Sequence, residues 1–139
     1  MRNGPLRAFV FDAYGTLFDV HSIIALAETI APRQGAVLSQ IWRTKQLQYT
    51  WLQSLMRGSI DGRDDFAALT EKALDYAASQ LTIPLGDDAR QQLLDAYLHL
   101  TPFPDAAAAL SDLAPRPRLI LSNGSLANLS PIARMYAAP

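Results

Sequence analysis

The sequence predicts an α/β fold in which an incomplete parallel sheet carries an inserted helical cap subdomain. Two short apolar runs, residues 8–11 and 118–121, have the length and composition of strands. Between residues 19 and 100 the apolar residues instead recur at helical spacing, with no strand pattern. A helical block of that length exceeds a simple crossover between two strands. We therefore expect residues 1–18 and 101–139 to form the core and residues 19–100 to form the cap.

Composition narrows the function classes. With 139 residues, 50% of them hydrophobic, the chain can build one domain, or a small core carrying an insertion. Its 12 basic and 13 acidic residues give a formal charge of -1, so no charge argument favours nucleic acid or a membrane surface as a partner. The absence of cysteine excludes disulfides and thiol nucleophiles. No signal-peptide or membrane-spanning pattern is present, and we expect a cytoplasmic protein.

The first apolar run ends at a carboxylate, Asp12. An uninterrupted run such as residues 8–11 is typical of a strand buried on both faces, and ligands bind at the carboxyl ends of parallel strands. Gly15 permits a sharp turn after the strand, and Thr16 can direct its hydroxyl back towards the carboxylate. Asp12 is thus a candidate nucleophile or metal ligand; the alternative is a strand-end residue that caps the turn.

A long amphipathic helix is expected over residues 37–56, with Gly58 beyond its end. Arg43 lies off its apolar stripe, on an adjacent face with Leu47 and Thr50, where it is either a solvated arginine or a group presented to a second surface. The residues of the stripe itself recur at steps of three and four: Leu38, Ile41, Trp42, Tyr49, Leu52 and Met56.

The remaining helices follow from apolar spacing and breaking residues. One is expected over residues 23–30, capped by Asp19 or Ser22, and another over residues 66–81 after a capping turn at 61–65. A further helix, capped by Asp87 or Asp88, is expected to reach about residue 98. Short helices over 105–114 and 126–136 flank the second strand.

The ends of the two strands supply the candidate site. Ser122-Asn123-Gly124 follows the second strand as Asp12 follows the first, so these groups share one crevice if the strands are neighbours. Residues 11–19, Phe-Asp-Ala-Tyr-Gly-Thr-Leu-Phe-Asp, resemble motif I of the haloacid dehalogenase superfamily, and residues 121–125, Leu-Ser-Asn-Gly-Ser, resemble its motif II. Residues 42–52 resemble the cap of the L-2-haloacid dehalogenases within that superfamily.

The resemblance implies a haloacid dehalogenase-like Rossmannoid core and hydrolysis of L-2-haloacids to D-2-hydroxy acids. Asp12 would displace halide from C2 with inversion, leaving an aspartyl ester that water hydrolyses. Arg43 and Asn123 would hold the halide, Ser122 the substrate carboxylate, and Thr16 would orient Asp12. Tyr14 and Leu47 would line the apolar side of the pocket.

No metal or other cofactor is expected from this resemblance. Phosphatases of the superfamily carry a second Asp where this chain has Tyr14, and use it with magnesium to release an alkoxide. A halide leaves without a proton, so a dehalogenase can dispense with that acid. Tyr14 therefore favours dehalogenation over the phosphatase alternative, and the resemblance suggests a homodimer as the assembly.

Two further motifs of the family have no match. The family uses a later lysine to neutralise the nucleophile, yet no lysine follows Lys72, and a Ser/Asn/Asp cluster beyond that lysine is also unmatched. We therefore expect a C-terminally truncated member whose two strands leave an apolar sheet edge. The alternative function is a non-catalytic remnant or association module.

Overall fold

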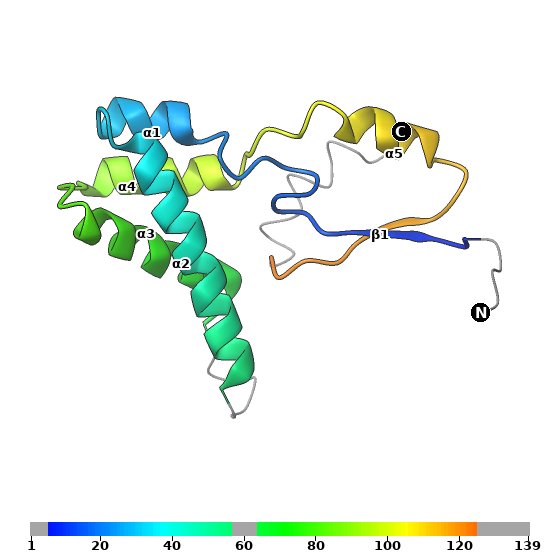
Figure 1. Ribbon diagram of the computed structural model, residues 1–139, viewed down its shortest axis with the longest axis horizontal. Helices are drawn as coiled ribbons and strands as arrows, with labels where there is room; N and C mark the ends of the chain where they lie inside the picture. The colour runs from blue at the N-terminus through cyan, green and yellow to red at the C-terminus, as the bar shows by residue number, and fades with distance from the viewer. Residues whose placement is uncertain (1–5, 57–63, 125–139) are drawn as a thin grey trace.

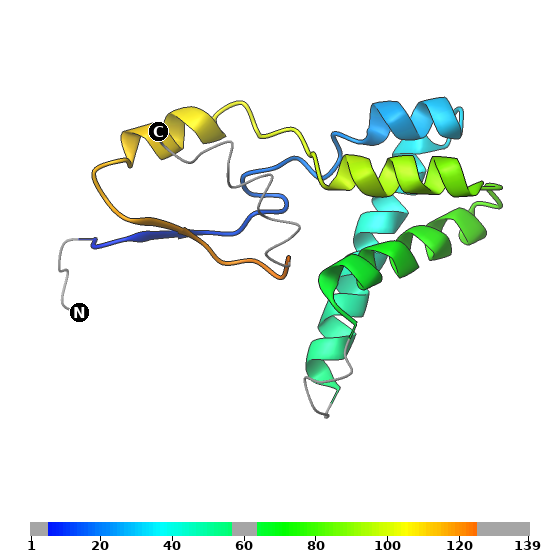
Figure 2. The same cartoon turned by 180° about the vertical axis from the view of Figure 1, so that it is seen from behind.

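The computed structural model describes residues 6–56 and 64–124 (Figure 1). The helix expected at residues 126–136, Gly58, and most of the turn at 61–65 lie outside the described residues. Along the chain the elements are β1 (Phe9–Phe11), α1 (Ile24–Ile30), α2 (Gly35–Leu55), α3 (Phe66–Gln80), α4 (Asp87–Tyr97), α5 (Ala106–Asp112) and β2 (Arg118–Ile120). Helices α1 to α4 form one block, and β1, β2 and α5 form another beside it (Figures 1 and 2).

The sheet confirms the expected parallel pairing. β1 and β2 pair in parallel with Val10 opposite Leu119, and Arg118 donates from Nη1 to the Leu110 carbonyl of α5 at 2.7 Å. Only the face towards α5 is covered in the described part of the chain, since Val10 is 61% exposed and Leu119 53% exposed. The expectation that β1 is buried on both faces is wrong for these residues, because none of the described elements covers the other face.

The core of the helical block forms where α2 packs against α1 and α3. Leu38 and Trp42 are fully buried, which confirms the first half of the expected α2 stripe. α1 and α2 meet closely at Gly35, where an added Cβ would lie 2.4 Å from the backbone nitrogen of Glu28. The Glu28 carboxylate in turn accepts from the Ala36 amide in the first turn of α2 at 3.2 Å. This contact satisfies one of the amides that a helix start leaves unpaired.

The last two residues of the stripe are not buried. Leu52 is 56% exposed and Met56 65% exposed, although their spacing continues that of Leu38 and Trp42. The physical reason lies in the packing, because α2 runs on past the body of the helical block at its C-terminal end (Figure 1). Helical periodicity identifies a face of a helix but not how far along the helix that face is covered.

The sequence predicted the cap of α3 correctly and the cap of α1 wrongly. Asp65 caps α3 by accepting from the Ala68 amide at 2.8 Å, as the capping turn predicted. At α1, however, neither Asp19 nor Ser22 is the cap: Asp19 accepts from the His21 amide, and Ser22 accepts from the distant Thr101 amide. The N-cap of α4 is Gly86, so Asp87 and Asp88 belong to its first turn, where negative charge favours the helix dipole.

The two segments that join the blocks are hydrogen-bonded to each other. The Asp19 amide donates to the Thr101 carbonyl at 2.8 Å, and the Phe103 amide donates to the Leu17 carbonyl at 3.0 Å. The loop after β1 is therefore fixed to the segment that returns from α4. None of the helices that the structure describes is long and apolar enough to cross a membrane. The expected domain boundaries at 18/19 and 100/101 stay predictions.

Candidate active site

Asp12 and Ser122 leave the sheet at the same edge. The Leu121 amide donates to the Phe11 carbonyl at 2.8 Å, which continues the parallel register one step past the strands. Asp12 and Ser122 each come directly after these bonded residues. The carboxylate of Asp12 is exposed, and Ser122 is half-buried. An exposed carboxylate at the diverging ends of two parallel strands can be reached by a ligand.

The loop after Asp12 is a tight turn held by its own backbone. The Ala13 carbonyl accepts from the amides of Leu17 at 3.0 Å and Phe18 at 3.1 Å. Gly15 has a φ of +94°, a conformation that glycine adopts without strain and other residues do not. Thr16 is exposed, and within the described residues its hydroxyl makes no hydrogen bond to Asp12. The orienting role expected for Thr16 is not visible in these contacts.

Arg43 reaches this loop from α2. Its Nη2 donates to the Tyr14 backbone carbonyl at 2.9 Å, and its Nη1 donates to Oε1 of Gln46 at 2.7 Å. An added Cβ at Gly15 would lie 3.9 Å from Nη2, so the guanidinium lies beside the turn. Of the two interpretations of Arg43, the structure therefore favours presentation to a second surface over a solvated arginine. Leu47, one turn along α2, is half-buried.

Tyr14 is buried between the loop and the helical block. Its ring centroid lies 5.1 Å from that of Phe66 and 6.0 Å from that of Tyr97. Its hydroxyl is buried without a hydrogen-bond partner among the described residues. Burial, and secondarily the neighbouring Tyr97, raise the pKa of Tyr14 to about 12. The residue is thus a neutral aromatic wall at physiological pH.

The predicted residues after β2 make few contacts in the described structure. The Ser122 hydroxyl accepts from the Gly124 amide at 3.2 Å, which shapes its own turn, and Asn123 is exposed. Within the described residues, Asn123 makes no hydrogen bond with Arg43. The structure thus brings Arg43 to the Tyr14 loop, and Asp12 to the edge that carries Ser122, without joining Arg43 to Asn123.

Sequence reasoning missed a buried polar cluster behind Arg43. Gln46 and Thr70 are buried within the helical block, and Tyr97 joins them through its hydroxyl. The only sequence signal was the position of Gln46, three residues after Arg43 on one helix face. Thr70 and Tyr97 lie on other helices, so their proximity required the tertiary structure.

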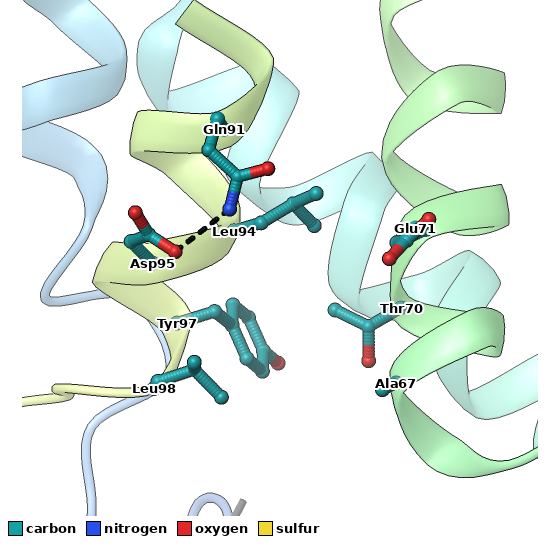
Figure 3. A pocket seen from close by; sticks show the side chains of 8 residues that line it. All are labelled: Ala67, Thr70, Glu71, Gln91, Leu94, Asp95, Tyr97 and Leu98. Carbon is teal, nitrogen blue, oxygen red and sulfur yellow. Dashed lines mark hydrogen bonds between the residues drawn. The ribbon is translucent and has the colours of Figure 1, made fainter. Parts of the chain in front are cut away.

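The described residues line two surface cavities on the helical block, and no predicted site residue lines either of these two. One, of about 240 Å³ between α3 and α4, is lined by Ala67, Thr70, Glu71, Gln91, Leu94, Asp95, Tyr97 and Leu98 (Figure 3). The other, of about 440 Å³ near the end of α2, is lined by Tyr49, Leu52, Gln53, Met56, Asp64, Leu69 and Lys72. Among the described residues, no group of three or more His, Cys, Asp or Glu could hold a metal ion.

Comparisons with a family model and with individual proteins all point to the same family. A model of the haloacid dehalogenase-like hydrolases matches residues 6–138. The chain is 47% identical over 122 residues to an (S)-2-haloacid dehalogenase of Pseudomonas putida, covering 86% of this chain and 52% of that protein. It is 46% identical over 121 residues to the (S)-2-haloacid dehalogenase of Xanthobacter autotrophicus, covering 86% of this chain and 46% of that protein.

A solved structure is similar in fold as well. The L-2-haloacid dehalogenase of Xanthobacter autotrophicus, with chloropropionic acid covalently bound, matches at a TM-score of 0.83 and 40% identity, covering 94% of this chain and 52% of that one. The chain spans about half the length of the curated relatives it matches. The match extends across both blocks of the fold, which supports an α/β core with an inserted helical cap.

Proposed function

The chain belongs to the haloacid dehalogenase-like hydrolases, and from this we propose that it acts in the hydrolytic dehalogenation of L-2-haloacids to D-2-hydroxy acids. The single observation that carries the proposal is the hydrogen bond from Arg43 to the backbone of the loop that follows Asp12. This arrangement puts a positive guanidinium from the helical block beside the turn that begins at a carboxylate. A carboxylate nucleophile and a cationic donor for a departing anion are the two groups that halide displacement needs.

In the first step, a carboxylate oxygen of Asp12 attacks C2 of the substrate. A carbon–oxygen bond forms, the carbon–halogen bond breaks, and the halide leaves with the electron pair, so C2 inverts. The product is an ester of Asp12. The chloropropionic acid covalently bound to the Xanthobacter autotrophicus relative supports a covalent route for this chain. Asp12 is exposed, so it is accessible to such a substrate.

In the second step, water attacks the carbonyl carbon of the ester. The bond between that carbon and the bridging ester oxygen, which came from Asp12, breaks. That oxygen leaves in the 2-hydroxy acid, and the oxygen of the water restores the Asp12 carboxylate. Over both steps, one water is consumed, and one halide and one proton are released.

We assign the remaining predicted residues by the charge that develops. Arg43 and Asn123 would bind the departing halide, because both carry N–H donors and Arg43 adds positive charge. Ser122 would bind the substrate carboxylate, and Thr16 would orient Asp12. Leu47 would line the apolar side with the ring of Tyr14, whose neighbours Phe66 and Tyr97 exclude water from that side.

The test separates the two steps. The chain is incubated at high concentration with L-2-chloropropionate, with the D enantiomer in parallel, while chloride release and intact protein mass are recorded. We expect chloride release with the L enantiomer, through turnover or through an adduct on Asp12, and neither signal from Asp12→Asn. Chloride release that persists in Asp12→Asn, or the absence of both signals in the wild type, would contradict the proposal. Magnesium-dependent hydrolysis of a phosphate ester would favour the phosphatase alternative.

A second candidate function, association between copies of the chain, is favoured by one exposed surface. At the end of α2, Trp51 is 60% exposed, Leu52 56% and Leu55 79%, which groups three large apolar side chains on one helix. Contiguous exposed apolar groups commonly mark interaction surfaces. Sedimentation equilibrium of the wild type and of Trp51→Glu/Leu55→Glu tests this, with a homodimer expected only for the wild type. A wild-type monomer at all concentrations would exclude it.

A further inference from the structure

We propose that Gln46 is a positioning residue that holds the Arg43 guanidinium against the Tyr14 loop while leaving its positive charge uncompensated for an anionic ligand. This inference rests on the proposed function, because it explains how the group assigned to the departing halide is kept in place and kept charged. It assigns a role to a residue that sequence reasoning passed over.

Gln46 is fully buried, and the oxygen of its side-chain amide accepts two hydrogen bonds. Oε1 accepts from Nη1 of Arg43 at 2.7 Å and from the Tyr97 hydroxyl at 2.8 Å, while Nε2 donates to Oγ1 of Thr70 at 2.6 Å. A carbonyl oxygen has two lone pairs, so these two donors fill its acceptor capacity. Rotating the amide by 180° would direct N–H groups at two donors.

The orientation of that amide is fixed independently by Thr70. Its hydroxyl donates to the Phe66 carbonyl at 2.6 Å, so its one proton is used and it can only accept from Gln46. The nitrogen of Gln46 must therefore face Thr70, and the oxygen must face Arg43 and Tyr97. In this way the Phe66 carbonyl of α3 orients Thr70, and Thr70 orients the amide of Gln46 so that its oxygen faces Arg43.

Three helices share in holding the arrangement. Arg43 and Gln46 lie on α2, Thr70 on α3 and Tyr97 on α4, and the last two face one another across the helical block (Figure 3). Trp42 contacts both of these residues. Its Nε1 donates to the Thr70 carbonyl at 2.8 Å, and its ring centroid lies 4.9 Å from that of Tyr97. Buried networks of hydrogen-bonded side chains restrict side-chain motion.

The two acceptors of Arg43 are both neutral. They are an amide oxygen and a backbone carbonyl, and no carboxylate within the described residues forms a salt bridge with Arg43. Arg90 shows the contrast, because Asp75 and Glu71 both pair with it on the surface. A glutamate at position 46 would still accept from Arg43, but it would lose the bond to Thr70 and would cancel the positive charge of the guanidinium. Glutamine supplies the geometry without the neutralisation, as anion binding requires.

The test compares the wild type with Gln46→Leu and Gln46→Glu, with Gln91→Leu as the control because exposed Gln91 bonds only within α4. Order at the Arg43 Nε–Hε group is measured by ¹⁵N relaxation, and bromide affinity by titration, with Arg43→Ala identifying the specific site. We expect Gln46→Leu to leave Arg43 mobile, and Gln46→Glu to keep it ordered. The bromide affinity of both Gln46 variants should be lower than that of the wild type by about tenfold or more. Gln91→Leu should match the wild type in both readouts.

Several outcomes would overturn the proposal. It fails if Arg43 stays as ordered in Gln46→Leu as in the wild type, or if Gln46→Glu binds bromide with wild-type affinity. If Gln46→Leu does not fold, Tyr97→Phe replaces it, because it removes one donor to the same oxygen; unchanged Arg43 order there counts against the proposal. Wild-type protein that binds no bromide, but whose Arg43 is ordered through Gln46, contradicts the proposed function and leaves the positioning role standing.

Discussion

Arg43 and Tyr14 are joined across 29 positions of sequence by a hydrogen bond of 2.9 Å from the guanidinium to the backbone carbonyl. The acceptor belongs to the loop that follows Asp12, and the donor belongs to the longest helix of the helical block. The Arg43 side chain therefore links the two parts of the candidate site directly.

Replacing Arg43 should slow the first chemical step. Arg43→Ala removes a donor to the departing halide, and loss of one such donor costs roughly 2.7 to 4 kcal/mol, or about 100- to 1000-fold in rate. The measurement is the rate of chloride release or of adduct formation on Asp12. Arg43→Lys keeps the charge but not the two-pronged geometry, so it should recover only part of the loss. An Arg43→Ala rate within threefold of the wild type would remove Arg43 from the site.

Gly15→Ala should destabilise the chain through its backbone rather than through a clash. The φ of Gly15 is +94°, while the nearest atom to an added Cβ is 3.9 Å away, an ordinary contact. A left-handed conformation costs other residues roughly 1–2 kcal/mol, so we expect a fall of about that size in the free energy of unfolding. Urea denaturation provides the measurement.

Gly86→Ala is the matched control for that substitution. Gly86 has a φ of -72° and no atom within 4 Å of an added Cβ, so neither strain nor crowding opposes alanine. Reduced entropy of the unfolded chain offsets the poorer N-cap, and the change should stay within about 0.5 kcal/mol. Equal losses in the two variants would show that Gly15 is not special.

Tyr14→Phe should leave the fold at least as stable as the wild type. The Tyr14 hydroxyl is buried without a partner among the described residues, and such a group costs about 1–3 kcal/mol in lost hydration. Phenylalanine keeps the packing on Phe66 and Tyr97 and removes that cost. Chemical denaturation should therefore show an unchanged or higher midpoint. A drop of more than about 1 kcal/mol would mean that the hydroxyl has a partner in solution.

The wild type should lose stability at alkaline pH. Burial raises the pKa of Tyr14 from 10.0 to about 12, so above pH 10 the unfolded chain releases its phenol proton while the folded chain retains it. The unfolded state then binds fewer protons, and the free energy of unfolding falls between pH 10 and 12. Tyr97, whose pKa burial also raises, acts in the same direction. Tyr14→Phe should show a shallower decline; identical slopes for both proteins would refute the assignment.

Local patterns predicted those parts of the structure that local forces determine. The strands, the five described helices and the cap at Asp65 follow from spacing and turn chemistry, and each expected end lies within two residues of the observed one. The failed caps at Asp19 and Ser22 have another cause. The Asp19 side chain instead closes a local turn with the His21 amide. The Ser22 hydroxyl accepts from the Thr101 amide of the returning segment, a long-range bond that no local pattern predicts.

The sequence likewise predicted only part of the candidate site. Asp12 and Ser122 could be placed at one edge because parallel strands bring their carboxyl ends together. The surroundings of Arg43 could not be predicted from the sequence. Gln46 is a polar residue, and its burial depends on Thr70 and Tyr97 from two other helices. The exposed end of the α2 stripe failed for the same physical reason, since coverage is a tertiary property.

The pairing of the two segments that join the blocks gives the helical block a modular character. Its entrance and exit lie side by side, with Asp19 bonded to Thr101 and Leu17 bonded to Phe103. A unit whose ends are neighbours can be exchanged between related proteins by cutting at those two points, without changing the path of either strand. Chimeras that carry a relative's helical block on this core would keep the crossing bonds, because these are made by the backbone alone.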